Sequence, residues 1–201
     1  MTARITSMLV SVVGAAVVVA AGSLAPGPGA AMAATPSSAF VPVGIVRTEM
    51  HVVGFDAQAA AAHGYEIRTT LDGKQYSAKK TASATSLAAT PTSVIEGNCG
   101  LSYVYEYGIG NRAAELYTGY AVYQDVIYWR WQVRLDDRGG SSYRNYLGGP
   151  NLGSWQVDQV IGGLAPGGAR AMVIPGNSWA LLVNGAICTA GAASSSTTIT
   201  P

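Results

Sequence analysis

The side chains that most often carry out catalysis are few in this sequence, and their spacing matches no common catalytic or metal-binding motif. His51 and His63 are the only histidines, and neither stands at ligand spacing from the other or from a cysteine. The segment Gly176–Ala180, GNSWA, loosely resembles the turn that carries a catalytic serine. A strand pattern follows it, however, where that turn requires a helix. We therefore predict no catalytic residue, no metal site and no cofactor.

Paired carboxylates could still support one reaction, the hydrolysis of glycosidic bonds. That chemistry needs two carboxyl groups about 5–10 Å apart across a pocket. The candidate acids are Glu106, Glu115, Asp125, Asp136, Asp137 and Asp158. Sequence alone does not bring any two of them to this separation, so a carboxylate-dependent hydrolase is kept as an alternative.

An aromatic run follows the first cysteine, in the segment GNCGLSYVYEYGIGN at 97–111. Tyr103, Tyr105 and Tyr107 are spaced by two, so on a strand they share one face. The opposite face carries Ser102, Val104 and Glu106. We expect the tyrosine side to be core at its start and increasingly exposed towards its end.

Two interpretations of these tyrosines are open. One is structural, a half-buried aromatic ladder paired across the sheet with neighbours such as Tyr117 and Tyr120. The other is functional, an exposed platform on which sugar rings stack. The candidates for such ligand binding are Tyr103, Tyr105, Tyr107, Tyr128, Tyr143, Tyr146 and Trp155.

The chain contains two cysteines, Cys99 and Cys188. In an oxidising compartment two thiols are expected to form one disulfide. A loop of roughly 100 residues closed in this way is stabilised by about 4.7 kcal/mol in the chain-entropy model. A free or metal-binding pair is the alternative, and no histidine at ligand spacing supports it.

The first 33 residues have the features of a secretory signal peptide. Arg4 precedes an uncharged, mostly apolar stretch, and the small-x-small sequence Ala31–Ala33 fits a cleavage site. A retained membrane anchor is the alternative, because the apolar stretch is nearly long enough to span a bilayer. We predict export, cleavage between Ala33 and Ala34, and no membrane attachment afterwards.

The mature chain is predicted to be electrically neutral. The full sequence has 12 Lys and Arg and 11 Asp and Glu, and Arg4 is lost with the signal peptide. Nucleic-acid binding requires a basic stripe. The nearest feature is Lys74, Lys79 and Lys80 around one turn, so no nucleic-acid partner is predicted.

The mature sequence divides into a small N-terminal unit, a connection and a main domain. Residues 34–76 are expected to contain a strand from about Val43 to Val53, a short helix capped by Asp56, and a hairpin turning at Asp72-Gly73. Residues 77–97, rich in Ala, Ser and Thr, are expected to form a linker. Residues 98–201 are the main domain.

The main domain is β throughout. The expected strands are Cys99–Ile109, Arg112–Tyr123, Val126–Asp136, Ser141–Leu147, Leu152–Val160, Ala169–Ile174, Trp179–Val183, Ala186–Thr189 and Ser195–Thr200. Turns rich in Gly, Pro and Asn separate most of them. Short, evenly spaced strands predict an antiparallel β-sandwich with one short N-terminal helix and one disulfide.

One strand shows the clearest alternation. In DVIYWRWQVRLDD, Ile127, Trp129, Trp131, Val133 and Leu135 are expected to point inward, with charged and polar residues between them. A period of two over ten residues predicts one buried and one solvated face. This strand should lie centrally in the sheet.

Two stretches, Phe55–Ser77 and EGNCGLSYVYEYGIGN with its later partner AICTAG, resemble small secreted proteins of high-GC Gram-positive bacteria, an uncharacterised group. The resemblance implies a secreted, disulfide-tied β protein. It implies no activity and no site residues.

The expected function is that of a secreted, non-enzymatic binding or surface-associated protein, with cell-wall or extracellular polysaccharide as its ligand. A secreted hydrolase acting through carboxylates is one alternative. The other is a secreted inhibitor or protein-interaction domain that uses an exposed loop such as Gly148–Gly153.

Overall fold

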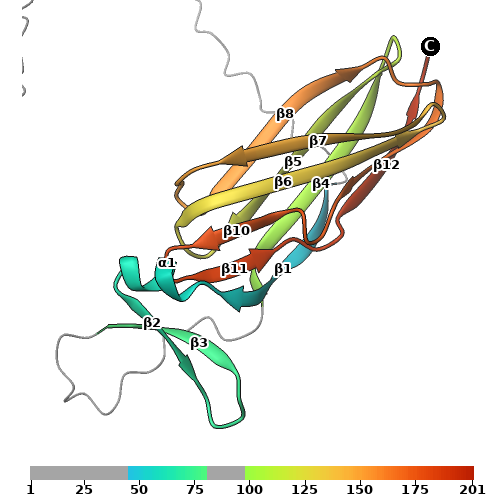
Figure 1. Cartoon of the computed structure of the whole chain (residues 1–201). Coiled ribbons are helices and arrows are strands. Elements are labelled where there is room, and N and C mark those ends of the chain that lie inside the picture. The colour runs from blue at the N-terminus through green and yellow to red at the C-terminus, as the bar shows by residue number, and fades with distance from the viewer. Residues whose placement is uncertain (1–44, 81–97) are drawn as a thin grey trace, which may run out of the picture. The chain divides into compact units, whose positions relative to one another are not determined.

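The computed structural model describes residues 45–80 and 98–201. The predicted signal peptide and residues 81–97 of the predicted linker lie outside these ranges. Within them the chain forms one helix and twelve strands (Figure 1). The elements are β1 (Val46–Phe55), α1 (Ala57–Ala62), β2 (Tyr65–Thr69), β3 (Gln75–Lys79), β4 (Asn98–Gly110), β5 (Ala113–Val122), β6 (Val126–Asp137), β7 (Gly140–Gly148), β8 (Ser154–Gly162), β9 (Gly167–Val173), β10 (Trp179–Leu182), β11 (Ala186–Thr189) and β12 (Ser194–Ile199).

The strands predicted for the main part of the chain are confirmed. All nine that were expected between Cys99 and Thr200 occur, with ends within two residues of the expected positions. Each pair of named strands is antiparallel. Local turn chemistry explains this agreement, because Gly, Pro and Asn interrupt most of the β-branched and aromatic runs.

The sandwich expected from the sequence is not confirmed. Ten strands form one continuous sheet in the order β12-β9-β6-β10-β11-β1-β4-β5-β8, with β7 also paired to β6. Strand β6 provides the continuity, because its first half pairs with β10 and its second half with β9. Register shifts such as the one between Leu181 and Leu182 let strands bend and change partners.

The N-terminal strand belongs to this sheet. β1 lies between β11 and β4, where Val52 is opposite Cys188 and Arg47 is opposite Tyr103. The strand expected in a separate N-terminal unit is therefore an interior strand of the main sheet. Local sequence could not reveal this, because the partners of β1 are far away in the chain.

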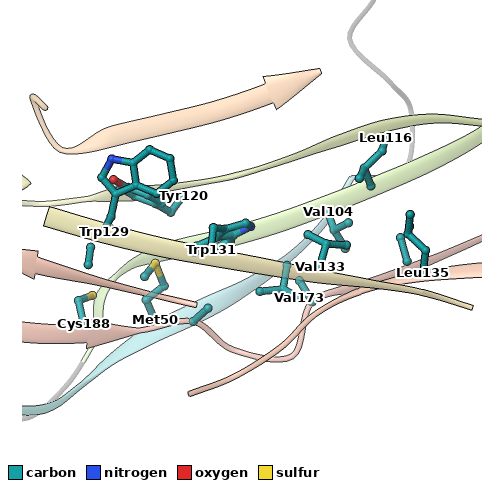
Figure 2. Packing of buried hydrophobic residues seen from close by; sticks show 14 of the residues in the cluster. Met50, Val104, Leu116, Tyr120, Trp129, Trp131, Val133, Leu135, Val173 and Cys188 are labelled. Carbon is teal, nitrogen blue, oxygen red and sulfur yellow. The ribbon is translucent and has the colours of Figure 1, made fainter. Parts of the chain in front are cut away.

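The sheet folds back so that strands far apart in its order face each other. The indole Nε1 of Trp131, on β6, donates a 3.0 Å hydrogen bond to Oγ1 of Thr118, on β5. The ring of Tyr120, also on β5, lies 5.4 Å from that of Trp131. One face of the sheet thus encloses the core, in which side chains from β1, β4, β5, β6, β9 and β11 meet (Figure 2).

The alternation predicted for β6 is confirmed for four of its five inward residues. Trp129, Trp131, Val133 and Leu135 are buried. Ile127 is only half-buried, and its neighbour Val126 occupies the core position instead. The register shift on the adjacent strand β10 accounts for this difference, because Leu182 pairs with Val126 and position 127 is passed over.

Cys99 and Cys188 form the predicted disulfide, which excludes a free or metal-binding pair. Their Cα atoms are 6.1 Å apart, and both residues are fully buried. The bond joins β4 to β11, the two strands that flank β1.

The predicted helix and hairpin also occur. Asp56 caps α1, since its Oδ1 accepts hydrogen bonds of 2.9 Å from the backbone amides of Gln58 and Ala59. β2 and β3 form a separate two-stranded hairpin around Asp72. β3 continues to Lys79, so residues 77–79 of the expected linker belong to this strand.

The Asp56→Ala substitution removes the capping acceptor and leaves two amides at the helix start without a partner. We expect it to lower the free energy of unfolding by about 1 kcal/mol, measured by urea denaturation. Asp56→Asn keeps an acceptor and should stay within about 0.5 kcal/mol of the wild type. Equal losses in both variants would contradict a capping role.

Candidate functional site

The strand β4 presents its tyrosines on the outer face of the sheet. Val104 and Glu106 are almost fully buried, whereas Tyr107 between Glu106 and Gly108 is 49% exposed. Leu101, at the start of the row, is already 36% exposed. The expected change from core to solvent is therefore found only in part: Cys99 is in the core and Tyr107 is exposed, but the change begins at Leu101 and is not gradual.

The outer row of β4 continues onto β5. The rings of Tyr103 and Tyr117 are 5.5 Å apart and inclined by 22°, and those of Tyr105 and Tyr107 are 6.4 Å apart and inclined by 6°. We call these four residues the tyrosine face. Tyr120, the other expected neighbour, points into the core instead.

The inner end of the tyrosine face is anchored to β8. The Tyr103 hydroxyl donates to the carbonyl oxygen of Trp155 at 3.5 Å, and burial raises its pKa. Gly119 lies opposite Tyr103, and a Cβ there would overlap the Trp155 carbonyl oxygen and crowd the Tyr103 hydroxyl. The Tyr117 hydroxyl donates to Oε1 of Gln156 at 2.7 Å. These two rings are therefore held in position before any ligand arrives.

A shallow hollow of about 280 Å³ opens beside the anchored rings. Its lining is mostly apolar, with one guanidinium group. The lining residues are Ile45, Arg47, Leu101, Tyr103, Tyr117 and Ala121.

Two carboxyl groups lie at the other end of the tyrosine face. Glu115 is opposite Tyr107, and Asp158 is opposite Tyr117. The negative charge of Asp158 raises the pKa of Glu115. This carboxyl pair adds hydrogen-bond acceptors to the aromatic surface.

The remaining aromatic candidates do not join the tyrosine face. Tyr128 lies on the outer face of β6, where its ring is 5.7 Å from that of Trp179. Trp155 points inward, with its ring 4.3 Å from that of Trp129 and 5.2 Å from that of Tyr146. Tyr143 is 49% exposed on β7. Trp155 is turned inward because it pairs with the core residue Tyr120.

Three of the other predicted carboxylates, Glu106, Asp136 and Asp137, lie near the end of β6, whereas Asp125 immediately precedes its start. Burial, followed by the nearby charge of Asp137, raises the pKa of Glu106 to about 7. Asp137 accepts from the backbone amides of Gly139 at 2.6 Å and Ala165 at 3.0 Å. Asp136 is held by Arg134 and Ser141. Both aspartates are thus engaged in structural contacts.

A hollow of about 380 Å³ beside these aspartates does not reach Glu106. It is lined by Asp136, Asp137, Arg138, Gly168, Ala169, Arg170, Ser196 and Thr197. Glu106 therefore lacks the access to a substrate that a catalytic acid requires.

Sequence reasoning missed Arg47, Gly119 and the closeness of Glu115 to Asp158. Strand spacing offered a partial signal, since Glu115 and Tyr117 are also spaced by two. The pairing of β5 with β8 and of β1 with β4 could not be derived from it.

Among residues 45–80 and 98–201, no group of three or more His, Cys, Asp or Glu side chains is placed to hold a metal ion. In the same residues no helix has the length and apolar character needed to cross a membrane.

No family model, curated protein or solved structure matches this chain. Its function is therefore inferred from the geometry of its own residues.

Proposed function

We propose that this protein is exported and binds polysaccharide, without catalysis, through the tyrosine face. The observation that carries the proposal is the outward row of four tyrosines on β4 and β5, two of them nearly parallel at 6°. A soluble monomer seldom leaves a contiguous aromatic surface open unless it is an interaction site.

Polysaccharide suits the chemistry of this surface. The flat faces of tyrosine rings stack on the apolar faces of sugar rings, and their hydroxyl groups can hydrogen-bond to the ligand. The Glu115–Asp158 pair and Arg47 supply further acceptors and donors for sugar hydroxyls. Electrical near-neutrality, at +1 for the full chain, argues against a strongly charged polymer as partner.

Export is supported by two features. The N-terminal sequence has the three parts of a signal peptide in their usual order, namely a basic residue, an apolar stretch and a small-x-small cleavage site. A buried disulfide is typical of proteins that fold in an oxidising compartment.

Binding is favoured over hydrolysis by the arrangement of the carboxyl groups. Glu115 and Asp158 are close enough that the charge of Asp158 raises the pKa of Glu115, but they line neither of the two hollows described above, whereas glycosidases place their two carboxyl groups across a pocket. Glu106 has a raised pKa but is 3% exposed. Neither arrangement places two acids across a substrate pocket.

The protein-interaction alternative retains one supporting observation. Leu152, in the loop that joins β7 to β8, is 88% exposed, and Leu147, near the end of β7, is 69% exposed. Apolar side chains at this exposure are frequent in contacts between proteins. Formation of a stable complex with an exported protease, and loss of that complex in Leu152→Ser, would favour this alternative.

The proposal is tested by retention of the mature chain on insoluble glycans, namely cellulose, chitin, xylan and purified cell wall. We expect retention on at least one of them. The Tyr105→Ala/Tyr107→Ala double variant should bind at least tenfold more weakly, which corresponds to about 1.4 kcal/mol.

Tyr143→Ala is the matched control, because Tyr143 and Tyr107 are both 49% exposed but Tyr143 lies on β7. Its binding should equal that of the wild type. No retention on any glycan, or full retention by the double variant, would refute the proposal.

A further inference from the structure

The C-terminal strand β12 is held against β4 in an unusual way. The backbone amide of Glu106 donates to Oγ of Ser195 at 3.2 Å, and that of Gly108 donates to Oγ1 of Thr197 at 3.0 Å. Side-chain hydroxyls thus replace the carbonyl partners of a regular ladder. Regular backbone pairing joins β12 to β9 on its other side.

This contact begins where another strand ends. β1 pairs with β4 only as far as Val104, and β12 takes over the same edge two residues later. The two backbones approach so closely that a Cβ on Gly108 would overlap the carbonyl oxygen of Thr198. β4 and β12 lie side by side here (Figure 1).

The carboxyl of Glu106 is influenced by the backbone of Ala171, which is paired with Ser195 in the β9–β12 ladder. Glu106 is 3% exposed, and its Oε2 is buried without a hydrogen-bond partner. The backbone of Ala171 on β9 lowers the pKa of this carboxyl, but by less than burial and the charge of Asp137 raise it. A buried carboxylate with one unsatisfied oxygen is tolerated when protonated and is strongly unfavourable when ionised.

The charged groups around Glu106 do not compensate an ionised carboxylate. From β6, Asp137 and Asp136 contribute further negative charge. β12 contains no titratable side chain. On β9 and the turn after β6, Arg170 and Arg138 line the neighbouring surface hollow. Among the described residues, the ion pairs join Arg68 to Glu66 and Arg134 to Asp136, and neither includes Glu106.

We propose that Glu106 is a pH-sensitive latch, which holds β12 against β4 while the carboxyl is protonated and releases β12 when it ionises. Release relieves the buried charge because water can then reach the carboxylate. The contacts that break are the hydroxyl-to-amide bonds at Ser195 and Thr197 and, on the other side of β12, its backbone pairing with β9. β12 is a terminal strand, so its departure leaves the rest of the sheet order intact.

The direction of the pH effect follows from the environment of Glu106. Burial and the neighbouring aspartates raise its pKa from 4.5 to about 7 in the closed state. The closed state is therefore favoured fully below about pH 4.5, and that advantage is lost as the pH rises through 7. The opening equilibrium constant should increase roughly 70-fold between about pH 5 and pH 8, with a plateau above that range.

Opening would leave strand edges to which another strand could pair. The amides of Glu106 and Gly108 would lose their partners, and β9 would lose β12 from its edge. An exposed strand edge is a template for pairing with an extended segment.

Hydrogen exchange followed from pH 5 to pH 8 tests the latch, with rates expressed as protection factors so that intrinsic exchange is removed. The amide of Val173 donates to the carbonyl oxygen of Ala193, the residue before β12, at 2.9 Å. In the wild type, protection at the amides of Glu106, Gly108 and Val173 should fall roughly 70-fold over this range. Amides of β5 and β8 should change little. In Glu106→Gln, which cannot ionise, the protection of all three should be independent of pH.

Glu115→Gln is the control, because Glu115 is an acid on the outer face of the neighbouring strand. It should keep the pH dependence of the wild type. Ser195→Ala/Thr197→Val should lower protection at every pH. Unchanged pH dependence of protection in Glu106→Gln, or an equal loss of protection in β5, would overturn the proposal. Protection factors in the wild type that do not change between pH 5 and pH 8 would also overturn it.

Discussion

Replacement of both Cys99 and Cys188 by alanine should lower the free energy of unfolding by about 4 kcal/mol, among the largest effects expected in this protein. The bond closes a loop with a sequence separation of 89, and its loss restores the conformational entropy of that loop in the unfolded state. Urea denaturation followed by tryptophan fluorescence should show the midpoint reduced by roughly 2 M.

The position of the disulfide adds to this effect. β4 and β11 both pair with β1, and the bond ties these two partners together through the core. Reductant should destabilise the wild type to the same extent as the double alanine variant. It should have no effect on that variant, and a midpoint shift below about 0.5 M would contradict the prediction.

Trp131→Ala should lower the free energy of unfolding by about 4 kcal/mol. Trp131 is the largest of the wholly buried side chains, and its removal leaves a cavity where β6 faces β5. The substitution also removes the donor to Thr118 Oγ1. The Thr118 hydroxyl in turn donates to the carbonyl oxygen of Tyr103 at 2.9 Å, so the loss reaches the strand that carries the tyrosine face.

Two further variants separate packing from hydrogen bonding. Trp131→Phe keeps an aromatic ring but removes the donor, and its loss should be about half as large. Trp179→Ala deletes a half-buried indole on the outer face beside Tyr128, and it should cost less than about 2 kcal/mol. Equal effects at positions 131 and 179 would mean that the core does not lie where β6 faces β5.

The agreement between sequence and structure is best for features that depend on neighbouring residues. Asp56 caps the helix because a carboxylate at that position reaches the next free amides. The strand with Trp129 and Trp131 alternates as predicted, because side chains on a strand point to opposite faces in turn. The two cysteines could pair only with each other within the chain.

Alternation separates the two faces of a strand but does not decide which face is buried. Tyr103, Tyr105 and Tyr107 share a face, as their spacing requires. That this face is the outer one depends on how the sheet folds back on Val104 and Glu106, which involves strands distant in the chain.

The register between β4 and β5 is another feature that the sequence does not predict, and it depends on a single position. The turn between these strands uses Asn111 and Arg112, both with positive φ at 51° and 57°. A register shift between Gly108 and Gly110 then moves β4 by one residue against β5. Without that shift Tyr105 would not lie opposite Tyr117, and a single-residue bulge has no reliable signature in the sequence.

By itself, the sequence determined the strands, their turns, the helix cap, the identity of the disulfide partners and the fact that three tyrosines share a face. These properties arise from interactions between residues close in the chain or from the simple availability of partners. Only the tertiary structure decided that β1 is an interior strand, that Trp155 faces the core, and that Glu106 is buried. Those outcomes depend on which distant strands pair, and that choice is made by the packing of the whole sheet.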